Sequence, residues 1–186
     1  MNKFIHLIWF GEINSEVDRS VMQHTALNPN RVVWLHRDME HLNEKYKRLL
    51  KYAKPPQLQS DLLRWSLLEK FGGWYFDIDI VPIVPVQHIE NELNLDGSKM
   101  FLTSRRGFPN NDIIYVKKSW KFWERIHNYL NDYSIEGEAI WYSCFSLDVI
   151  CKALIGPDDC DRWILGPPKK FCKSESAWAY RKCEDI

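Results

Sequence analysis

Two carboxylates stand two positions apart in an otherwise apolar stretch, GGWYFDIDIVPI, at residues 72–83. If the stretch is a strand, Asp77 and Asp79 project from the same face, with Cα atoms about 6.5–7 Å apart. Unpaired, they would repel each other and lose hydration, whereas a divalent cation removes both penalties. Oxygen ligands favour Mg²⁺, Mn²⁺ or Ca²⁺, and Mg²⁺ and Mn²⁺ sites often combine carboxylates with substrate phosphates. The spacing therefore predicts a site for a metal ion and a diphosphate; the alternative is a solvated or arginine-paired strand end.

A second pair of charged residues precedes this stretch. Asp61 and Arg64 lie three positions apart in a segment whose apolar residues recur at helical spacing, so both side chains are expected on one helix face. On an exposed surface such an ion pair contributes little to stability. Considered together with the carboxylates that follow Gly72 and Gly73, the pair is instead a candidate part of the same site.

Hydrophobic periodicity predicts strands that alternate with helices in the first half of the chain, which is the pattern of an α/β domain. The expected strands are residues 3–10, 31–36, 74–81, 100–104 and 113–116, the last two forming a hairpin. The expected helices are residues 16–27, 39–50, 57–71, 119–131 and 138–155. Ser15 and Asp18 resemble a capping pair for the first helix. Residues 82–99 and the tail after Gly156 are expected to be irregular.

The composition is that of a globular protein of one domain, which we expect to span residues 1–186. Lys and Arg number 25 and Asp and Glu 25, so a formal charge of zero gives no general attraction to nucleic acid or anionic membranes. No apolar run predicts a transmembrane helix, and apolar residues 4–10 are too few for a signal peptide, so we expect a cytoplasmic protein. Five cysteines without a CxxC pair favour reduced thiols over a disulfide framework or zinc site.

The charged residues belong to a longer pattern. Residues 8–9 read IW, residues 60–64 read SDLLR and residues 72–79 read GGWYFDID. In order and spacing this resembles the catalytic core of DXD-motif sugar transferases: yeast-type α-mannosyltransferases, capsular and lipooligosaccharide glycosyltransferases, and the glucosyltransferase domains of clostridial toxins. The resemblance is closest over residues 3–84. It implies a GT-A-like nucleotide-binding α/β fold, with a central mixed sheet flanked by helices, and a metal-dependent hexosyltransferase that retains anomeric configuration.

The resemblance assigns four residues to the nucleotide and the metal. It implies that Trp9 stacks on the nucleotide base and that Tyr75 packs near the nucleotide. Asp77 is expected to reach the ribose and the metal shell, and Asp79 to bind Mn²⁺ or Mg²⁺ directly.

Further residues are assigned to the donor sugar and the leaving group. Asp61 and Arg64 are expected to hydrogen-bond the donor sugar, and Asn111, in the run PNNDIIYV, to lie near it. Ser176 and Trp178 resemble an S-x-W element of the toxin branch, in which the serine completes the metal shell and the tryptophan covers the leaving diphosphate.

The sequence leaves the substrates and two other functions open. Lys173 occupies the position at which the toxins have an acidic residue, which leaves the third metal ligand undecided. The resembling families use UDP-sugars, favoured here, and GDP-mannose; the acceptor is a glycan or another hydroxyl compound. A metal-dependent phosphohydrolase or nucleotidyltransferase also uses paired aspartates, usually with more carboxylates nearby. A nucleotide-sugar-binding module without activity would keep the same motifs.

Overall fold

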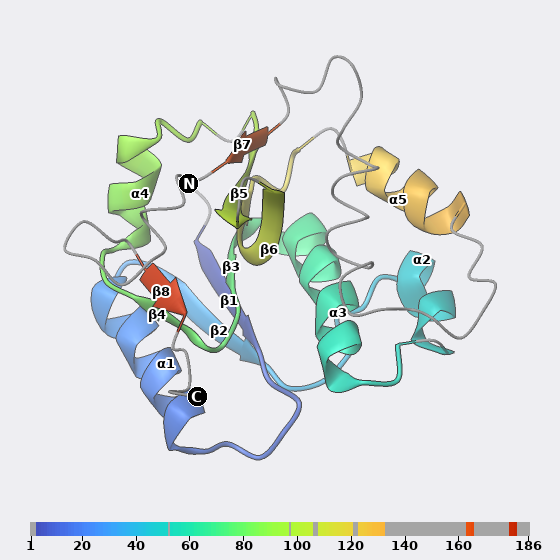
Figure 1. The fold of residues 1–186 in the computed structure, drawn as a ribbon, viewed down its shortest axis with the longest axis horizontal. Coiled ribbons are helices and arrows are strands. Elements are labelled where there is room, and N and C mark those ends of the chain that lie inside the picture. Colours follow the sequence, from blue (N-terminus) through green and yellow to red (C-terminus); the bar gives the residue numbers. More distant parts are fainter. Residues whose placement is uncertain are drawn as a thin grey trace.

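A mixed β-sheet forms the middle layer of the protein (Figure 1). The computed structural model describes residues 3–51, 53–96, 98–105, 108–120, 123–132, 163–165 and 179–181. The strands in these residues are β1 (Phe4–Ile8), β2 (Val32–His36), β3 (Gly73–Phe76), β4 (Ile80–Pro82), β5 (Met100–Arg105), β6 (Phe108–Val116), β7 (Trp163–Leu165) and β8 (Ala179–Arg181). Six of them form the sheet, in the order β2-β1-β3-β6-β5-β7, and β4 pairs separately with β8. β1 is parallel to β2 and β3, whereas β6 is antiparallel to β3 and β5.

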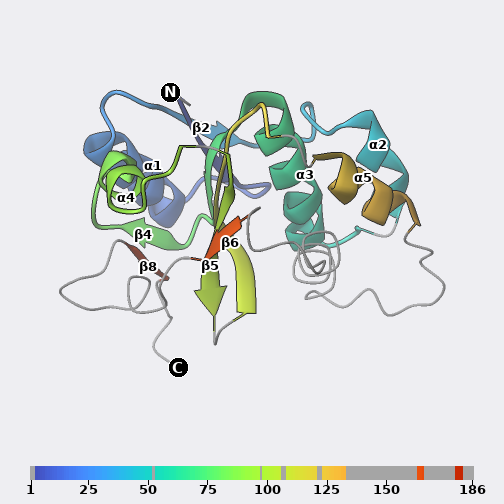
Figure 2. The same cartoon turned by 90° about the horizontal axis from the view of Figure 1, so that it is seen from above.

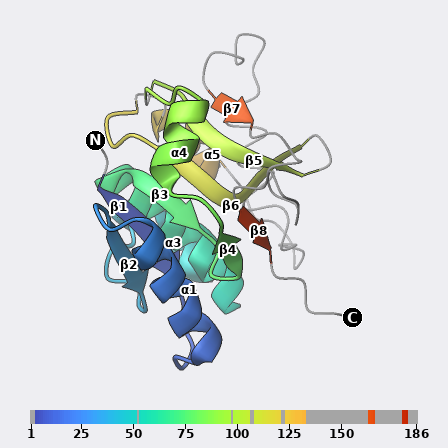
Figure 3. The ribbon, with the colours of Figure 1, turned by 90° about the vertical axis from the view of Figure 1, so that its left-hand side faces the viewer.

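Helices cover both faces of this sheet (Figure 2). They are α1 (Ser15–Leu27), α2 (Glu44–Lys47), the 3₁₀ helix η1 (Arg48–Lys51), α3 (Pro56–Phe71), α4 (Val86–Glu92) and α5 (Trp123–Asp132). α1 and α4 lie on one face, and α3 lies on the other with α2 and α5 outside it. Figure 3 shows α1 alongside β2 and β4. In the part of the chain that the structure describes, no helix combines the length and hydrophobicity needed to cross a membrane.

Alternation of side chains along the strands divides the core into two clusters, one on each face of the sheet. On β3, Trp74 and Phe76 belong to the cluster under α1 and α4, and Tyr75 belongs to the cluster under α3. The neighbouring strands alternate in the same way: Ile5, Leu7, Phe101, Ile113 and Tyr115 face α1 and α4, and Ile8, Met100, Leu102, Ile114 and Val116 face α3. The polar end of Tyr75 is therefore directed toward the helix that carries Asp61 and Arg64.

These elements confirm the expected α/β class and the mixed sheet flanked by helices. The strands predicted at residues 3–10, 31–36, 100–104 and 113–116 are β1, β2, β5 and β6, and the helices predicted at residues 16–27 and 57–71 are α1 and α3. The helix predicted at residues 119–131 is α5, which begins at Trp123. The helix predicted at residues 138–155 lies outside the described residues.

The helix predicted at residues 39–50 is wrong in extent, because Asn43 interrupts it. The backbone N–H of Asn43 donates to Ser66 Oγ at 3.0 Å, and its side chain donates to Glu69 Oε2 at 2.7 Å. Both acceptors belong to α3, so the hydrogen bonds from Asn43 to α3 outweigh the helical preference of residues 39–50. The Asn43 side chain then accepts from the N–H of Lys45 and starts the short α2.

Other boundaries also depend on contacts that periodicity does not record. Asn14, rather than the predicted Ser15, caps α1, since its Oδ1 accepts the N–H groups of Glu16 and Val17. Residues 82–99 were expected to be irregular but contain α4, whose Val86 N–H donates to Asn28 Oδ1 at 2.8 Å. The tail, expected to be loop-rich, contributes strands β7 and β8.

Gly72 and Gly73 join α3 to β3 in a conformation that other residues rarely adopt. Their φ angles are 65° and 108°. A Cβ on Gly73 would lie 2.4 Å from the carbonyl oxygen of Phe4 on β1. The absent side chain therefore allows β3 to approach β1, and it fixes the point at which β3 begins.

We predict that Gly73→Ala lowers the free energy of unfolding by about 2–4 kcal/mol, because the strained φ and the clash with β1 add. Urea denaturation measures the change. Gly11→Ala is the control, since its Cβ would meet only the indole of Trp9, at 3.1 Å, and its φ is not positive. Equal losses in the two variants would contradict the explanation.

His6 is a buried titratable residue that joins β1 to β2 and to the glycine turn. Its Nε2 lies 3.0 Å from the carbonyl oxygen of Gly72, and its Nδ1 lies 3.0 Å from Nε2 of His36. Because a carbonyl only accepts, His6 Nε2 carries the proton, and His36 donates to His6 Nδ1. Burial lowers the pKa of His6 to about 4 and the pKa of His36 to about 3.

Stability is therefore expected to fall as the pH decreases from 6.5 toward 4. In this range these histidines bind protons in the unfolded chain but remain neutral in the folded protein. Their contribution to the free energy of unfolding is therefore complete above pH 6.5 and is lost below it. For His6 alone the loss reaches roughly 3 kcal/mol. Urea unfolding between pH 7.5 and 4.5 should show a smaller slope for His6→Asn than for the wild type.

Candidate functional site

A cavity of about 590 Å³ lies at the carboxyl ends of the parallel strands β1 and β3. Four segments line it: residues 8–11 after β1, the N-terminal half of α3, Tyr75 with residues 77–79, and Asn110 with Asn111 on β6. Open α/β sheets bind ligands at this edge of their parallel strands. The topology therefore gathers most of the residues that the sequence singled out.

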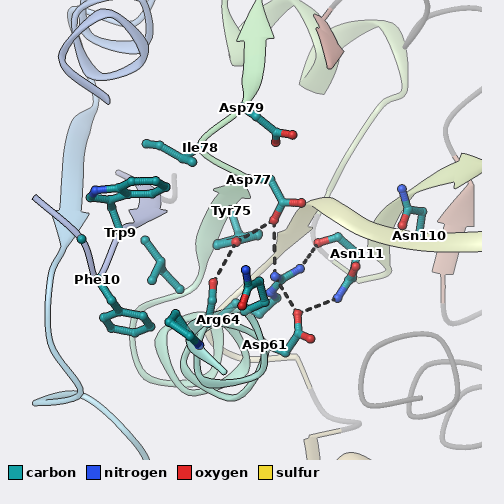
Figure 4. A pocket seen from close by; sticks show the side chains of 15 residues that line it. Trp9, Phe10, Asp61, Arg64, Tyr75, Asp77, Ile78, Asp79, Asn110 and Asn111 are labelled. Atoms are coloured by element: carbon teal, nitrogen blue, oxygen red, sulfur yellow. Dashed lines mark hydrogen bonds and ion pairs between the residues drawn. The ribbon is translucent and has the colours of Figure 1, made fainter. Parts of the chain in front are cut away.

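The guanidinium of Arg64 lies in the cavity wall and joins three elements (Figure 4). Its Nη2 is 2.7 Å from Asp61 Oδ1, as their helical spacing predicts, and 3.3 Å from Asp77 Oδ1. Its Nη1 donates to the backbone oxygen of Asn111 at 2.7 Å. The side chain is only 6% exposed, so this is not the weak surface ion pair of the alternative interpretation. One cation thus connects α3, the end of β3 and β6.

Tyr75 completes this arrangement beneath the cavity. Its ring lies 4.5 Å from the guanidinium carbon of Arg64. Its hydroxyl donates to Asp77 Oδ1 at 2.8 Å and lies 3.5 Å from Ser60 Oγ. Tyr75 therefore contacts the cation and the first of the two aspartates at once.

The pKa values of Asp61 and Arg64 are both raised, which disfavours the charged form of Asp61 and favours that of Arg64. Burial raises the pKa of Asp61 to about 6, while Arg64 and a hydrogen bond from Asn111 lower it and Asp77 raises it. Burial opposes the charge of Arg64, but Tyr75 and the surrounding aspartates keep its pKa above the ordinary value. The site thus holds a permanent cation next to a carboxyl group whose pKa is about 6.

The strand that carries the two aspartates ends earlier than predicted. β3 stops at Phe76, and residues 77–79 form a turn in which Ile80 N–H donates to Asp77 O at 3.0 Å. One continuous strand over residues 74–81 is therefore a wrong prediction. The N–H of Asp77 still donates to Asp112 O on β6, at 2.8 Å. The chain turns directly after this hydrogen bond. Asp77, partly buried, and Asp79, exposed, nevertheless line the same cavity.

Trp9 lies on the opposite side of the cavity from Asn110 and Asn111 (Figure 4). Its backbone N–H donates to His36 O at 2.9 Å, and its indole N–H donates to Glu12 O at 2.8 Å. The ring is partly exposed and lines the cavity beside Phe10. It offers an aromatic surface on which a planar ring can stack.

The sequence of this region matches a known family. Residues 5–96 match the model of the glycosyltransferase sugar-binding region containing a DXD motif. The match supports the resemblance to DXD-motif glycosyltransferases that the sequence motifs indicated. The matched region of the glycosyltransferase supplies Trp9, the α3 pair and both aspartates, and the asparagines of β6 lie beyond its end.

Two solved structures share the fold of this glycosyltransferase. The PaToxG glycosyltransferase has a TM-score of 0.61 and 18% identity, covering 82% of this chain and 67% of that one. A glycosyltransferase involved in the glycosylation of the major capsid of PBCV-1 has a TM-score of 0.55 and 12% identity, covering 98% of this chain and 94% of that one. Among curated proteins, none matches the sequence. The expected GT-A-like α/β fold is confirmed.

The cavity of this glycosyltransferase offers oxygen ligands that suit a metal bound together with a substrate. Among the residues that the structure describes, no group of three or more His, Cys, Asp or Glu side chains can hold a metal by itself. Asp77 and Asp79 provide two carboxylates, which fits Mg²⁺ or Mn²⁺ when water and phosphates complete the shell. Ser176 and Trp178, predicted to contact the metal and the diphosphate, lie outside the described residues.

A bulge in β6, which the sequence did not predict, shapes the cavity wall. Leu102 pairs with Ile114, but the next residue, Thr103, pairs with Asn110, so β6 carries extra residues there. The hydroxyl of the buried Thr103 contacts both Asn110 O and Asp112 Oδ1. The bulge brings the Asn111 carbonyl to Arg64 and its amide to Asp61, 3.3 Å away. No sequence pattern indicates this bulge, because it depends on pairing between two strands.

We predict that Asp61→Asn stabilises the protein at pH 8 and impairs glycosyl transfer. The folded-state pKa of Asp61, about 6, exceeds its ordinary 3.8, so the wild type loses stability as the pH rises through 6. The variant avoids that loss and should gain up to about 3 kcal/mol at pH 8. Urea unfolding at pH 5 and pH 8 measures the difference, with the exposed Asp18→Asn as control. A destabilised Asp61→Asn at pH 8 would show that the ion pair with Arg64 outweighs the cost of burial.

Proposed function

We propose that this protein is a metal-dependent hexosyltransferase that moves a sugar from a nucleotide-sugar to an acceptor hydroxyl, with retention of anomeric configuration. The observation that supports this best is that Trp9, Asp77 and Asp79 line one cavity. A nucleotide-sugar consists of an aromatic base, a diphosphate and a sugar, and the cavity has a complementary group for each. A UDP-sugar is the favoured donor, and GDP-mannose is the alternative.

In the proposed complex, Trp9 stacks on the base, and Asp77 and Asp79 hold Mn²⁺ or Mg²⁺ at the diphosphate. When bound, the ion supplies Lewis-acid stabilisation of the charge on the departing diphosphate. Asp77 is also expected to reach the ribose. By resemblance to the toxin branch, Ser176 adds a metal ligand and Trp178 covers the diphosphate and excludes water.

The donor sugar is proposed to lie over Asp61, Arg64 and Asn111. With a pKa of about 6, Asp61 is largely ionised at neutral pH and can accept hydrogen bonds from sugar hydroxyls. Arg64 keeps that carboxylate and Asp77 in place through its two ion pairs. Both asparagines of β6 line the cavity, and Asn111 also donates to Asp61.

Retention is proposed to follow from attack by the acceptor hydroxyl on the face from which the diphosphate departs, which requires no enzyme nucleophile. A glycan or another hydroxyl compound is the proposed acceptor, and nucleic acid is not expected. We further propose that residues 1–186 form one catalytic domain and that it works in the cytoplasm.

Two rival functions make different predictions about the product. A phosphohydrolase would split the donor into a nucleoside monophosphate and a sugar phosphate, and a nucleotidyltransferase would move the nucleotidyl group to an acceptor and release the sugar phosphate, whereas sugar transfer releases the nucleoside diphosphate. An inactive binding module would bind the donor and release neither. The described residues hold no cluster of three acidic metal ligands, which favours transfer over the first rival.

Thermal unfolding with a panel of donors tests the proposal. UDP-glucose, UDP-galactose, UDP-GlcNAc, GDP-mannose and free UDP and GDP are each added with and without Mn²⁺. One nucleotide family should raise the melting temperature by about 5–10 °C at 100 times its Kd, and only with Mn²⁺.

In the same experiment Asp79→Asn should lose this shift and at least about 100-fold of the transfer rate, because a metal ligand is removed while the fold is kept. Asp18→Asn, exposed on α1 and outside the cavity, is the matched control. Full activity of Asp79→Asn, or no Mn²⁺-dependent shift with any donor, would refute the proposal.

A further inference from the structure

Tyr75 has contacts that a residue packing against the nucleotide does not need. It is 1% exposed, so very little of it is accessible from the cavity. Its ring faces the guanidinium of Arg64, and its hydroxyl donates to Asp77 Oδ1 at 2.8 Å.

The first aspartate of the motif is held through both its backbone and its side chain. The backbone of Asp77 donates to Asp112 O at 2.8 Å and accepts from Ile80 N–H at 3.0 Å. Its Oδ1 is contacted by Tyr75 and by Arg64, and Figure 4 shows the second carboxylate oxygen directed away from that pair. Asp79 is exposed in the turn.

Tyr75 lies closer to Asp77 Oδ1 than Arg64 does. Arg64 Nη2 is 3.3 Å from that oxygen but 2.7 Å from Asp61, so its main partner is the other carboxylate. The hydroxyl of Tyr75 is 2.8 Å from Asp77 and 3.5 Å from Ser60, so its main partner is Asp77. Groups that hydrogen-bond a metal ligand set its orientation and commonly change metal affinity by about 10–100-fold.

We propose that Tyr75 is a positioning residue for the metal: its hydroxyl fixes the carboxylate of Asp77 in the orientation that binds the ion with the nucleotide diphosphate. The inference rests on the proposed function, since it requires that Asp77 is a metal ligand. It assigns to Tyr75 a contact with the metal ligand in place of the contact with the nucleotide that the resemblance implies.

Tyr75→Phe tests this inference, because it keeps the ring over Arg64 and removes only the hydroxyl. Free Mn²⁺ is measured by electron paramagnetic resonance while the ion is titrated into the full chain with saturating UDP. The variant should raise the Kd for Mn²⁺ about 10-fold or more. Its affinity for UDP without metal should stay within about twofold of the wild type.

Ser60→Ala is the matched control. It removes the other hydroxyl near Tyr75 and leaves the bond between Tyr75 and Asp77 in place. Its Kd for Mn²⁺ should therefore stay within about twofold of the wild type. Thermal unfolding without metal shows whether a variant has lost stability in general. A general loss of stability would not selectively weaken Mn²⁺ binding, whereas a change at Asp77 would.

A double-mutant cycle with Asp77→Asn tests whether Tyr75 acts through this carboxylate. Added to Asp77→Asn, Tyr75→Phe should weaken Mn²⁺ binding no further. A wild-type Kd in Tyr75→Phe, or equal effects of this change in both backgrounds, would overturn the inference and leave the proposed function standing. No UDP-dependent Mn²⁺ binding by the wild type would overturn both.

Discussion

Arg64 places a full positive charge where water has almost no access, and such a charge is stable only when its partners are held around it. Those partners come from three elements: Asp61 on α3, Asp77 after β3 and the Asn111 carbonyl on β6. The cost of burying the guanidinium therefore becomes a constraint on how these elements meet. A lysine at this position would keep the charge but not the planar group that reaches all three partners.

The register of the parallel strands explains why an aromatic residue and two carboxylates share the cavity. Ile5 pairs with Trp74 and His6 with Tyr75, so β1 and β3 run side by side toward the cavity that Trp9 and both aspartates line. Gly73 sets that register, because no other residue can begin β3 so close to β1. Because Gly73 has no side chain, β1 and β3 can pair although their residues are almost 70 positions apart in the sequence.

The parts of the site that the sequence predicts are those governed by local geometry. Residues three apart on a helix are neighbours, and so Asp61 and Arg64 form their ion pair as expected. Alternation also predicts correctly that Trp74, Phe76, Ile78 and Ile80 face one cluster, even though the strand ends within this stretch. A period of two describes which face a residue takes but not where hydrogen bonding to the next strand stops.

The parts that the sequence does not predict depend on partners far along the chain. Asn43 shortens a helix because Ser66 and Glu69 bind it, and Thr103 contacts the bulge that directs Asn111 into the cavity. Each is a polar residue whose preferred backbone is decided by a bond to another element.

The position of β6 has a consequence for where this catalytic unit can be divided. The family match ends at residue 96, yet β3 pairs on its far side with β6, which ends at Val116. A fragment cut at residue 96 would leave Gly73–Phe76 as an open edge bearing Trp74, Tyr75 and Phe76 beside unpaired backbone groups, which is a surface prone to aggregation. It would also leave Arg64 without the carbonyl of Asn111. The segment that carries the recognisable motif is therefore smaller than the segment that can fold around it.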